Sequence, residues 1–207
     1  IMRQDIESLK KRDHKDVELF SKSALQEVDN LANVVQEMLL LARADAGLGA
    51  LNLQEISLEE LVFEAISRCE KLASSKGIKL KFNIENESKD DHKTVRGDKD
   101  LLENLVFNVI ENAIKYSPNN EIVTITLIWK NDVSQLIVDD NGPGIPAEQL
   151  PFIFERFSRG SNMETRVKGF GLGLAIAQKI ANLHEAKLSA GNHEGSGARF
   201  SFEIKNI

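Results

Sequence analysis

Several residue types that would support particular kinds of structure are scarce in this chain. It has one cysteine, Cys69, in 207 residues, which excludes an internal disulfide framework and a zinc site built from cysteines. Its longest plainly apolar run is the short segment 38–42, far below the roughly 20 residues that a membrane-spanning helix needs. The sequence therefore predicts neither a transmembrane helix nor a secretory signal.

An excess of positive charge is also absent. The chain has 26 lysine and arginine residues against 32 aspartate and glutamate residues, which gives a net charge of −6. Because sequence-independent nucleic-acid binding needs a basic surface that displaces counterions, we expect no nucleic-acid partner. A local basic pocket for phosphates is still compatible with this net charge. The overall composition, with 42% hydrophobic and 28% charged residues, is that of a globular protein.

The first 47 residues have a helical pattern. Helices are predicted over 1–11 and 16–46, and Gly47 is a natural end for the second one. Since the chain begins with Ile1 inside this pattern, we expect it to be a fragment of a longer protein. A heptad seam needs another helix to cover it, so we expect a homodimeric four-helix bundle, the alternative being packing against the rest of the same chain. The seam consists of Val17, Phe20, Ala24, Val28, Leu31, Val35, Met38 and Ala42.

Helices and strands are mixed from residue 48 onward. Ser57 begins a capping box, and Asp98 is a candidate helix N-cap. This part of the chain predicts an α+β fold, a two-layer sandwich in which helices cover one face of a mixed sheet. The predicted helices cover 58–75, 99–116, 147–155 and 171–184. The predicted strands lie near 78–84 and 94–96, in a hairpin of 122–130 with 133–139, and in a last hairpin over 187–204.

The predicted helix 99–116 carries amides on an otherwise apolar surface. Asn104, Asn108, Asn112 and Tyr116 recur every four residues, and Lys115 lies beside the end of the stripe. A half-buried asparagine is costly unless its amide is satisfied. Amide oxygens and a lysine suit hydrated Mg²⁺ and a polyphosphate, because Mg²⁺ keeps waters and phosphates among its ligands. The alternative is a solvent-exposed polar stripe.

A carboxylate and two glycines follow the strand that ends near residue 139. Asp140 accepts hydrogen bonds only, so in a pocket it would bind the exocyclic amine of adenine and repel the carbonyl of guanine. Gly142 and Gly144 would let the backbone approach a ligand without a Cβ clash. The alternative is an ordinary turn.

Glycines also open the predicted helix 171–184. The segment 169–174 (GFGLGL) leaves backbone N–H groups at a helix start, where they favour an anion. It is not a dinucleotide-binding fingerprint, and the chain contains neither a P-loop nor the protein-kinase catalytic loop. Just before it, residues 156–168 include four basic residues and one acidic residue. This stretch is either a lid that closes on a γ-phosphate or a solvated basic loop.

Taken together and in this order, these segments resemble the ATP-binding domain of bacterial sensor histidine kinases. The wider superfamily includes DNA gyrase, heat-shock protein 90 and the MutL ATPases. The resemblance covers about 48–207, and residues 1–47 resemble the later part of the dimerisation and phosphoacceptor hairpin. The matching segments are 108–116 (NVIENAIKY, the N box), 140–144 (DNGPG, the G1 box), 154–157 (FERF, the F box), 169–174 (the G2 box) and 195–200 (GSGARF, the final glycine turn).

The resemblance implies the cofactor Mg²⁺, the substrate ATP and a set of site residues. Asn112 would be the Mg²⁺ ligand, and Lys115 would contact phosphates. The implied catalytic residues are Asn108, Lys115 and Arg159, with Arg166 and Lys168 as alternatives to Arg159 for reaching the γ-phosphate. The implied ATP-binding residues are Asn108, Asn112, Lys115, Tyr116, Asp140, Gly142, Gly144, Gly169, Gly171, Leu172, Gly173 and Leu174.

One position separates two types of reaction. In the hydrolytic relatives the residue that matches Asn108 is a glutamate that activates water. Asparagine does not take up a proton at neutral pH, which favours phosphoryl transfer to a protein nucleophile over hydrolysis. Glu111 is expected to point to a different part of the helix surface.

The acceptor motif of the family, His-Glu-x-x-Thr-Pro, does not occur in this chain. His14 lies where the turn of the hairpin is expected, so we assign no phosphoacceptor here and expect it upstream of Ile1. His92, His184 and His193 are predicted to be surface or structural residues.

The resemblance thus predicts a sensor histidine kinase with a hairpin part, 1–47, and a catalytic domain, 48–207. It implies a homodimer, a response-regulator receiver domain as partner, and the cytoplasmic portion of a protein that meets a membrane only through other parts. Two alternatives are a hydrolytic ATPase of the same superfamily and a non-catalytic dimerising module with a degenerate site. We expect the fragment to bind ATP without phosphorylating itself.

Overall fold

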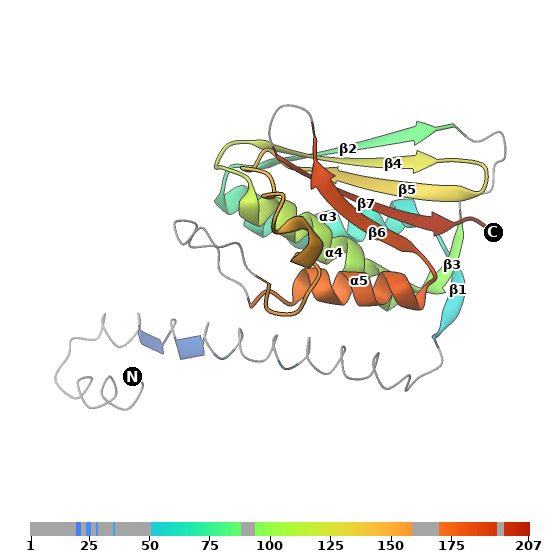
Figure 1. Ribbon diagram of the computed structural model, residues 1–207, viewed down its shortest axis with the longest axis horizontal. Helices are drawn as coiled ribbons and strands as arrows, with labels where there is room; N and C mark the ends of the chain where they lie inside the picture. Colours follow the sequence, from blue (N-terminus) through green and yellow to red (C-terminus); the bar gives the residue numbers. More distant parts are fainter. Residues whose placement is uncertain are drawn as a thin grey trace. The chain divides into compact units, whose positions relative to one another are not determined.

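The computed structural model of the chain is shown in Figure 1 and divides into two compact units, residues 1–40 and 41–207. The structure describes residues 20, 21, 24, 25, 28, 35, 51–87, 94–158, 170–193 and 197–207. The described residues of the first unit are helical, as predicted. Val28 and Val35 of the predicted seam are 54% and 56% exposed in the single chain. All of the predicted helix 1–11, the other residues of the predicted helix 16–46, and Gly47 lie outside the described residues.

A five-stranded sheet forms one layer of the second unit, in the order β2-β4-β5-β7-β6. β2 pairs with β4 in parallel, whereas the other three pairs are antiparallel, so the predicted mixed sheet is confirmed. The bounds are β2 (Lys79–Asn86), β4 (Ile122–Trp129), β5 (Val133–Asp139), β6 (Lys187–Asn192) and β7 (Ala198–Lys205).

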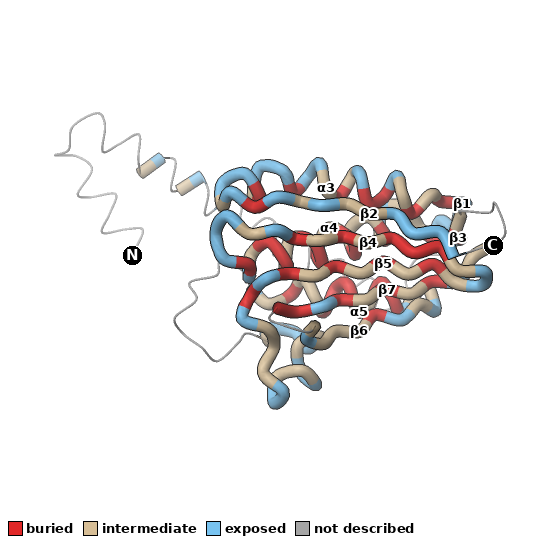
Figure 2. Tube along the Cα trace, turned by 90° about the horizontal axis from the view of Figure 1, so that it is seen from above, coloured by how far each residue is buried: buried red, intermediate tan, exposed pale blue. Residues whose placement is uncertain are grey.

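Three helices cover one face of this sheet (Figure 1): α3 (Leu58–Ser75), α4 (Lys99–Tyr116) and α5 (Gly173–Leu183). Burial alternates along the central strands because successive side chains of a strand point to opposite faces. Val138 pairs with Ile125 and Phe200 in the sheet, and all three are buried. Figure 2 shows the buried positions concentrated in β4, β5 and β7, while the edge strand β2 is largely exposed. The core therefore lies between the central strands and the helices.

The predicted helix starts are confirmed by their caps. Ser57 Oγ accepts a hydrogen bond from the backbone N–H of Glu60 at 3.4 Å, and Asp98 Oδ1 accepts one from Leu101 at 3.3 Å. Each bond satisfies an N–H group that has no partner within its helix. α4 ends at Tyr116, two residues before Pro118. The helix with the amide stripe is thus fixed at both ends by local sequence.

Two elements differ from the predictions. β1 (Leu53–Ile56) was not predicted; it pairs with β3 (Val95–Asp98) in a separate two-stranded sheet. The predicted α-helix over 147–155 is only the short 3₁₀ helix η1 (Leu150–Phe152). Pro151 would lie in the interior of the predicted α-helix, where it has no N–H to donate and its ring clashes with the preceding turn, whereas the first turn of η1 tolerates it. Within the described residues, no helix has both the length and the apolarity that crossing a bilayer requires.

Candidate functional site

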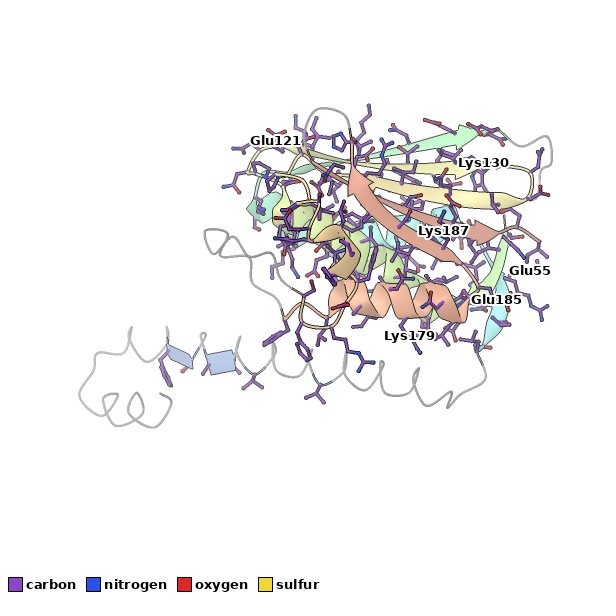
Figure 3. The ribbon with its side chains drawn as sticks, in the orientation of Figure 1. Glu55, Glu121, Lys130, Lys179, Glu185 and Lys187 are labelled. Carbon is purple, nitrogen blue, oxygen red and sulfur yellow. The ribbon has the colours of Figure 1, made fainter. Side chains whose placement is uncertain are left out.

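The last turn of α4 meets the loop that follows β5. A Cβ atom added to Gly142 would lie 2.8 Å from the carbonyl oxygen of Tyr116 and 2.9 Å from Asp140 Oδ1. Such distances are closer than side-chain carbons tolerate, so the backbone contact requires glycine at this position. Asn141 adds a tie to the start of β4, because its Nδ2 donates to Glu121 Oε2 at 3.0 Å. Figure 3 labels Glu121 at this end of the sheet and Lys130 at the opposite end of the sheet.

The start of α5 meets the middle of α4. A Cβ atom at Gly173 would lie 2.7 Å from Asn108 Oδ1. Asn108 is 7% exposed, and its Nδ2 donates to the carbonyl oxygen of Asn104 at 3.0 Å and to Asn104 Oδ1 at 2.6 Å. These bonds identify which atom of the amide is the nitrogen, and they leave Oδ1 facing α5. The stripe is therefore buried and satisfied at Asn108, which excludes the alternative of a purely solvent-exposed stripe at this position.

The next two members of the predicted site lie one and two turns further along α4. The Asn112 side chain is half-buried and makes no hydrogen bond to another described residue, so its amide oxygen is available to a ligand. Lys115 Nζ lies 2.8 Å from Glu111 Oε2. Glu111, which the sequence set apart from the stripe, therefore contacts a predicted site residue. Tyr116 follows, with 37% of its surface exposed.

The Asp140 carboxylate is buried at the end of β5. Asp140 is 2% exposed, and its Oδ1 accepts hydrogen bonds from the backbone N–H groups of Gly142 at 2.8 Å and Ala198 at 3.0 Å. Burial raises the pKa of Asp140, and the two backbone bonds and the nearby His193 offset only part of this rise. Oδ2 takes part in neither bond and remains an acceptor. The preceding Asp139 instead pairs with Arg199.

Glycines shape the approach to α5. Gly171 has a φ of +72°, and a Cβ atom there would lie 2.7 Å from the carbonyl oxygen of Ser158. Leu172, which precedes the helix, is buried and provides no side-chain cap, so the first N–H groups of α5 have no side-chain acceptor at the cap position. Leu174 is half-buried in the first turn. The structure thus places Gly173 against α4 at Asn108, and Gly171 against the backbone of residues 157 and 158.

Several predicted residues lie outside the part of the chain that the structure describes. They are Gly169, Arg159, Arg166, Lys168 and the rest of the basic stretch from 159 on. Gly144, in contrast, is described. It has a φ of +76°, and a Cβ atom there would lie 2.9 Å from Asn192 Oδ1.

The turn after β6 contributes two residues that the sequence did not assign to the site. Asn192 Oδ1 accepts from the N–H of Ile145 at 2.7 Å, and Asn192 Nδ2 donates to the carbonyl oxygen of the same residue at 2.9 Å. His193 Nε2 donates to the carbonyl oxygen of Asp140 at 2.8 Å. Both side chains therefore hold the loop that carries Asp140 and Gly144. No local pattern signals them, because their partners are main-chain atoms about 50 residues earlier.

The other histidines do not join the site within the described residues. His184 Nε2 accepts from the N–H of Asp98 at 2.9 Å, and its Nδ1 donates to the carbonyl oxygen of Ile180 at 2.8 Å. This residue is structural, as expected, and ties the end of α5 to the start of α4. His14 and His92 lie outside the described residues.

The donor set fits Mg²⁺ that arrives with a polyphosphate. Among the described residues, no group of three or more His, Cys, Asp or Glu side chains forms a metal cage. Mg²⁺ needs no such cage, because it binds through one or two protein oxygens together with phosphates and waters. The available Asn112 oxygen and the neighbouring Asn108 oxygen match this requirement.

Comparisons with known proteins agree with this arrangement. The model of the family "Histidine kinase-, DNA gyrase B-, and HSP90-like ATPase" matches residues 97–206. The sensor-like histidine kinase SenX3 of Mycobacterium tuberculosis is 30% identical over 193 residues, which are 93% of this chain and 46% of SenX3. The chain therefore spans less than half the length of this curated relative.

Solved structures give the same result. Histidine kinase ThkA in complex with response regulator protein TrrA has a TM-score of 0.74 and 25% identity, covering 99% of this chain and 56% of that chain. Full-length ShkA in complex with AMPPNP has a TM-score of 0.73 and 27% identity, covering 89% and 38%. The chain belongs to the histidine kinase-, DNA gyrase B- and HSP90-like ATPase family, and it carries the ATP-binding catalytic domain of a sensor histidine kinase.

Proposed function

We propose that this chain binds Mg-ATP and that, in the intact protein, the γ-phosphoryl group passes to a histidine of the dimerisation hairpin. From that histidine it passes to an aspartate of a response-regulator receiver domain. One observation carries the proposal: the amide stripe of α4, the buried carboxylate of Asp140 and the start of α5 meet at Gly142 and Gly173. In this proposal the hairpin lies within 1–47 and the catalytic domain within 48–207.

Each end of the nucleotide has its own residues. Asp140 Oδ2 accepts the exocyclic amine of adenine, and the same carboxylate repels the carbonyl that guanine has at that position. Lys115 and the first N–H groups of α5 neutralise phosphate charge, with Tyr116 beside them. Asn112, supported by Asn108, would hold Mg²⁺, which supplies charge neutralisation on the phosphates when it is bound.

The chemical step is a transfer in which the acceptor histidine nitrogen bonds to the γ-phosphorus while the bond to the ADP oxygen breaks. Little covalent assistance from the protein is needed, so positioning and charge neutralisation account for most of the catalysis. Asn108 cannot take a proton from water at neutral pH, and its amide is already bonded to Asn104. Transfer to a protein nucleophile is therefore favoured over hydrolysis. Arg159, Arg166 or Lys168 would complete the site from the lid.

Partners are proposed on separate grounds. The structure of ThkA with TrrA is a complex of a histidine kinase with a response regulator, which supports a receiver domain as the partner of this chain. The exposure of Val28 and Val35 supports a homodimer, because a heptad seam is stable only when another helix covers it. In the proposed whole protein, this chain is the cytoplasmic portion.

In this chain, nucleotide binding can be measured separately from phosphotransfer. We expect the chain, incubated with Mg-ATP labelled on the γ-phosphate, to bind the nucleotide and to acquire no acid-labile label, because it lacks the acceptor motif. Addition of a hairpin that contains the acceptor histidine of the intact protein should produce label on that histidine. Stoichiometric label on the fragment alone, or steady ATP hydrolysis well above background, would contradict the proposal.

A further inference from the structure

Lys76 lies outside the site described above, in the turn between α3 and β2. Its ammonium donates to three main-chain carbonyl oxygens at the end of α4: Ile114 at 2.8 Å, Lys115 at 2.9 Å and Ser117 at 2.6 Å. A lysine ammonium has three N–H donors, so these bonds use all of them. The side chain thus binds the end of a helix to which it does not belong.

The three carbonyls form an environment suited to a small cation. The last carbonyls of a helix have no partner within the helix and carry the negative end of its dipole. Ser117 is 2% exposed, so little water reaches its carbonyl while the Lys76 side chain is in place. Lys76 is partly buried, and burial lowers its pKa. The main chain adds a second tie, because the N–H of Asn120 donates to the carbonyl oxygen of Lys76 at 2.9 Å.

The turn that Lys76 holds carries two residues that we assign to the nucleotide site. It contains Lys115, assigned above to the phosphates, and Tyr116, whose carbonyl packs against Gly142 beside Asp140. A shift of this turn would move the phosphate end and the adenine end of the site together. Asn108 lies almost two turns earlier in the helix and would be less affected.

We propose that Lys76 is a positioning residue of the nucleotide site, whose ammonium acts as a built-in cation that locks the last turn of α4. The inference rests on the proposed function, because its consequence is tighter nucleotide binding. It makes a prediction that differs from that for an ordinary stabilising contact: a free ammonium ion should replace the side chain.

The first test is chemical rescue. Lys76→Ala should weaken the binding of ATP and of ADP, measured by calorimetry, by roughly tenfold, since bonds to a charged donor are lost. Ammonium chloride should restore most of the affinity, whereas tetramethylammonium chloride at equal ionic strength should not, because it has no N–H donor. Lys76→Arg should restore little, because a planar guanidinium cannot direct three bonds from one point. Equal effects of the two salts would overturn the proposal.

The second test is a double-mutant cycle with Lys115→Met. If Lys76 acts by positioning Lys115, the Lys76→Ala substitution should cost less affinity in the Lys115→Met background than in the parent chain. Additive losses would overturn the proposal. Lys99→Ala is the matched control. It removes a lysine that pairs with Glu64 at 2.9 Å at the other end of α4, and it should leave nucleotide affinity unchanged.

A third measurement needs no nucleotide. Hydrogen exchange at residues 115–117 should be faster in Lys76→Ala than in the parent, and ammonium should slow it again, while exchange in the first half of α4 stays unchanged. Unchanged exchange in the last turn would overturn the Lys76 proposal by itself. Failure of the parent chain to bind ATP would overturn the proposed function instead, so the two failures are distinguishable.

Discussion

At the residue scale, the buried carboxylate of Asp140 lowers the stability of the fold. Its carboxylate is almost fully buried and is held by two backbone N–H groups, yet burial leaves its pKa above the ordinary value of 3.8. A raised carboxyl pKa means that the charged form is less stable in the folded than in the unfolded chain, so ionisation of this group opposes folding. In the proposed function, this charge is the feature that distinguishes adenine from guanine.

We therefore expect Asp140→Asn to lose affinity without losing stability. The Asn Oδ1 still accepts from Gly142 and Ala198, but the charged acceptor for adenine is lost, which should weaken ATP binding by about 10- to 100-fold. The melting temperature at pH 7 should equal or exceed that of the parent. Because the folded pKa is raised, this advantage should shrink as the pH falls through the folded pKa and disappear below 3.8. A clear loss of stability at pH 7 would contradict this account.

The ion pair of Glu111 with Lys115 predicts a substitution that raises ATP affinity, in contrast to Asp140→Asn. Glu111 binds the ammonium that we assign to the phosphates, so nucleotide must compete with it. Glu111→Gln should raise the affinity for ATP by up to about fivefold, the amount that a partly exposed ion pair contributes. The dissociation constant from calorimetry is the measurement, and the gain should vanish in a Lys115→Met background. Glu103 is on α4 like Glu111, but it pairs with Arg68 of α3, so Glu103→Gln should show no gain. A decrease in affinity on Glu111→Gln would sink the idea.

At the scale of elements, α4 depends on its N-cap. Asp98 accepts from Leu101 through Oδ1 and from Asn52 through Oδ2 at 3.1 Å. Asp98→Ala should lower the free energy of unfolding by about 1–2 kcal/mol, measured by denaturant titration. Ser57→Ala on α3, whose cap bond is longer at 3.4 Å, should cost less. Equal or smaller losses for Asp98→Ala would show that tertiary contacts rather than the cap hold the start of α4.

The elements that could be predicted are those specified by local sequence. α4 has a cap, a periodic apolar face and a proline stop within one segment, and its amide stripe made the site visible before the fold was known. β1 could not be predicted in this way, because four residues carry little pattern and their partner strand β3 lies about 40 residues away. For the same reason, the sequence did not predict the roles of Asn192, His193 and Lys76. Each binds the main chain of a distant segment, and no local residue pattern indicates such a contact.

At the scale of the whole molecule, the lone cysteine reports on global packing. Cys69 is 1% exposed, and burial, with a smaller contribution from Glu111, raises its pKa to about 12 against opposing effects of Arg68 and Lys115. The thiolate is the reactive form. We expect almost no labelling by a thiol reagent at pH 8 in the folded chain and prompt labelling in denaturant. Prompt labelling of the native chain would show that the layer between α3 and α4 opens readily.

The central claim is that residues of α4, the loop after β5 and the start of α5 form one adenine-nucleotide site. Calorimetry with ATP, and separately with GTP, in the presence of Mg²⁺ tests it most directly. The account predicts one ATP per chain, binding of GTP at least about tenfold weaker because of the Asp140 carboxylate, and strong loss of ATP binding in Asp140→Asn. Absence of ATP binding, or equal affinity for the two nucleotides, would contradict it.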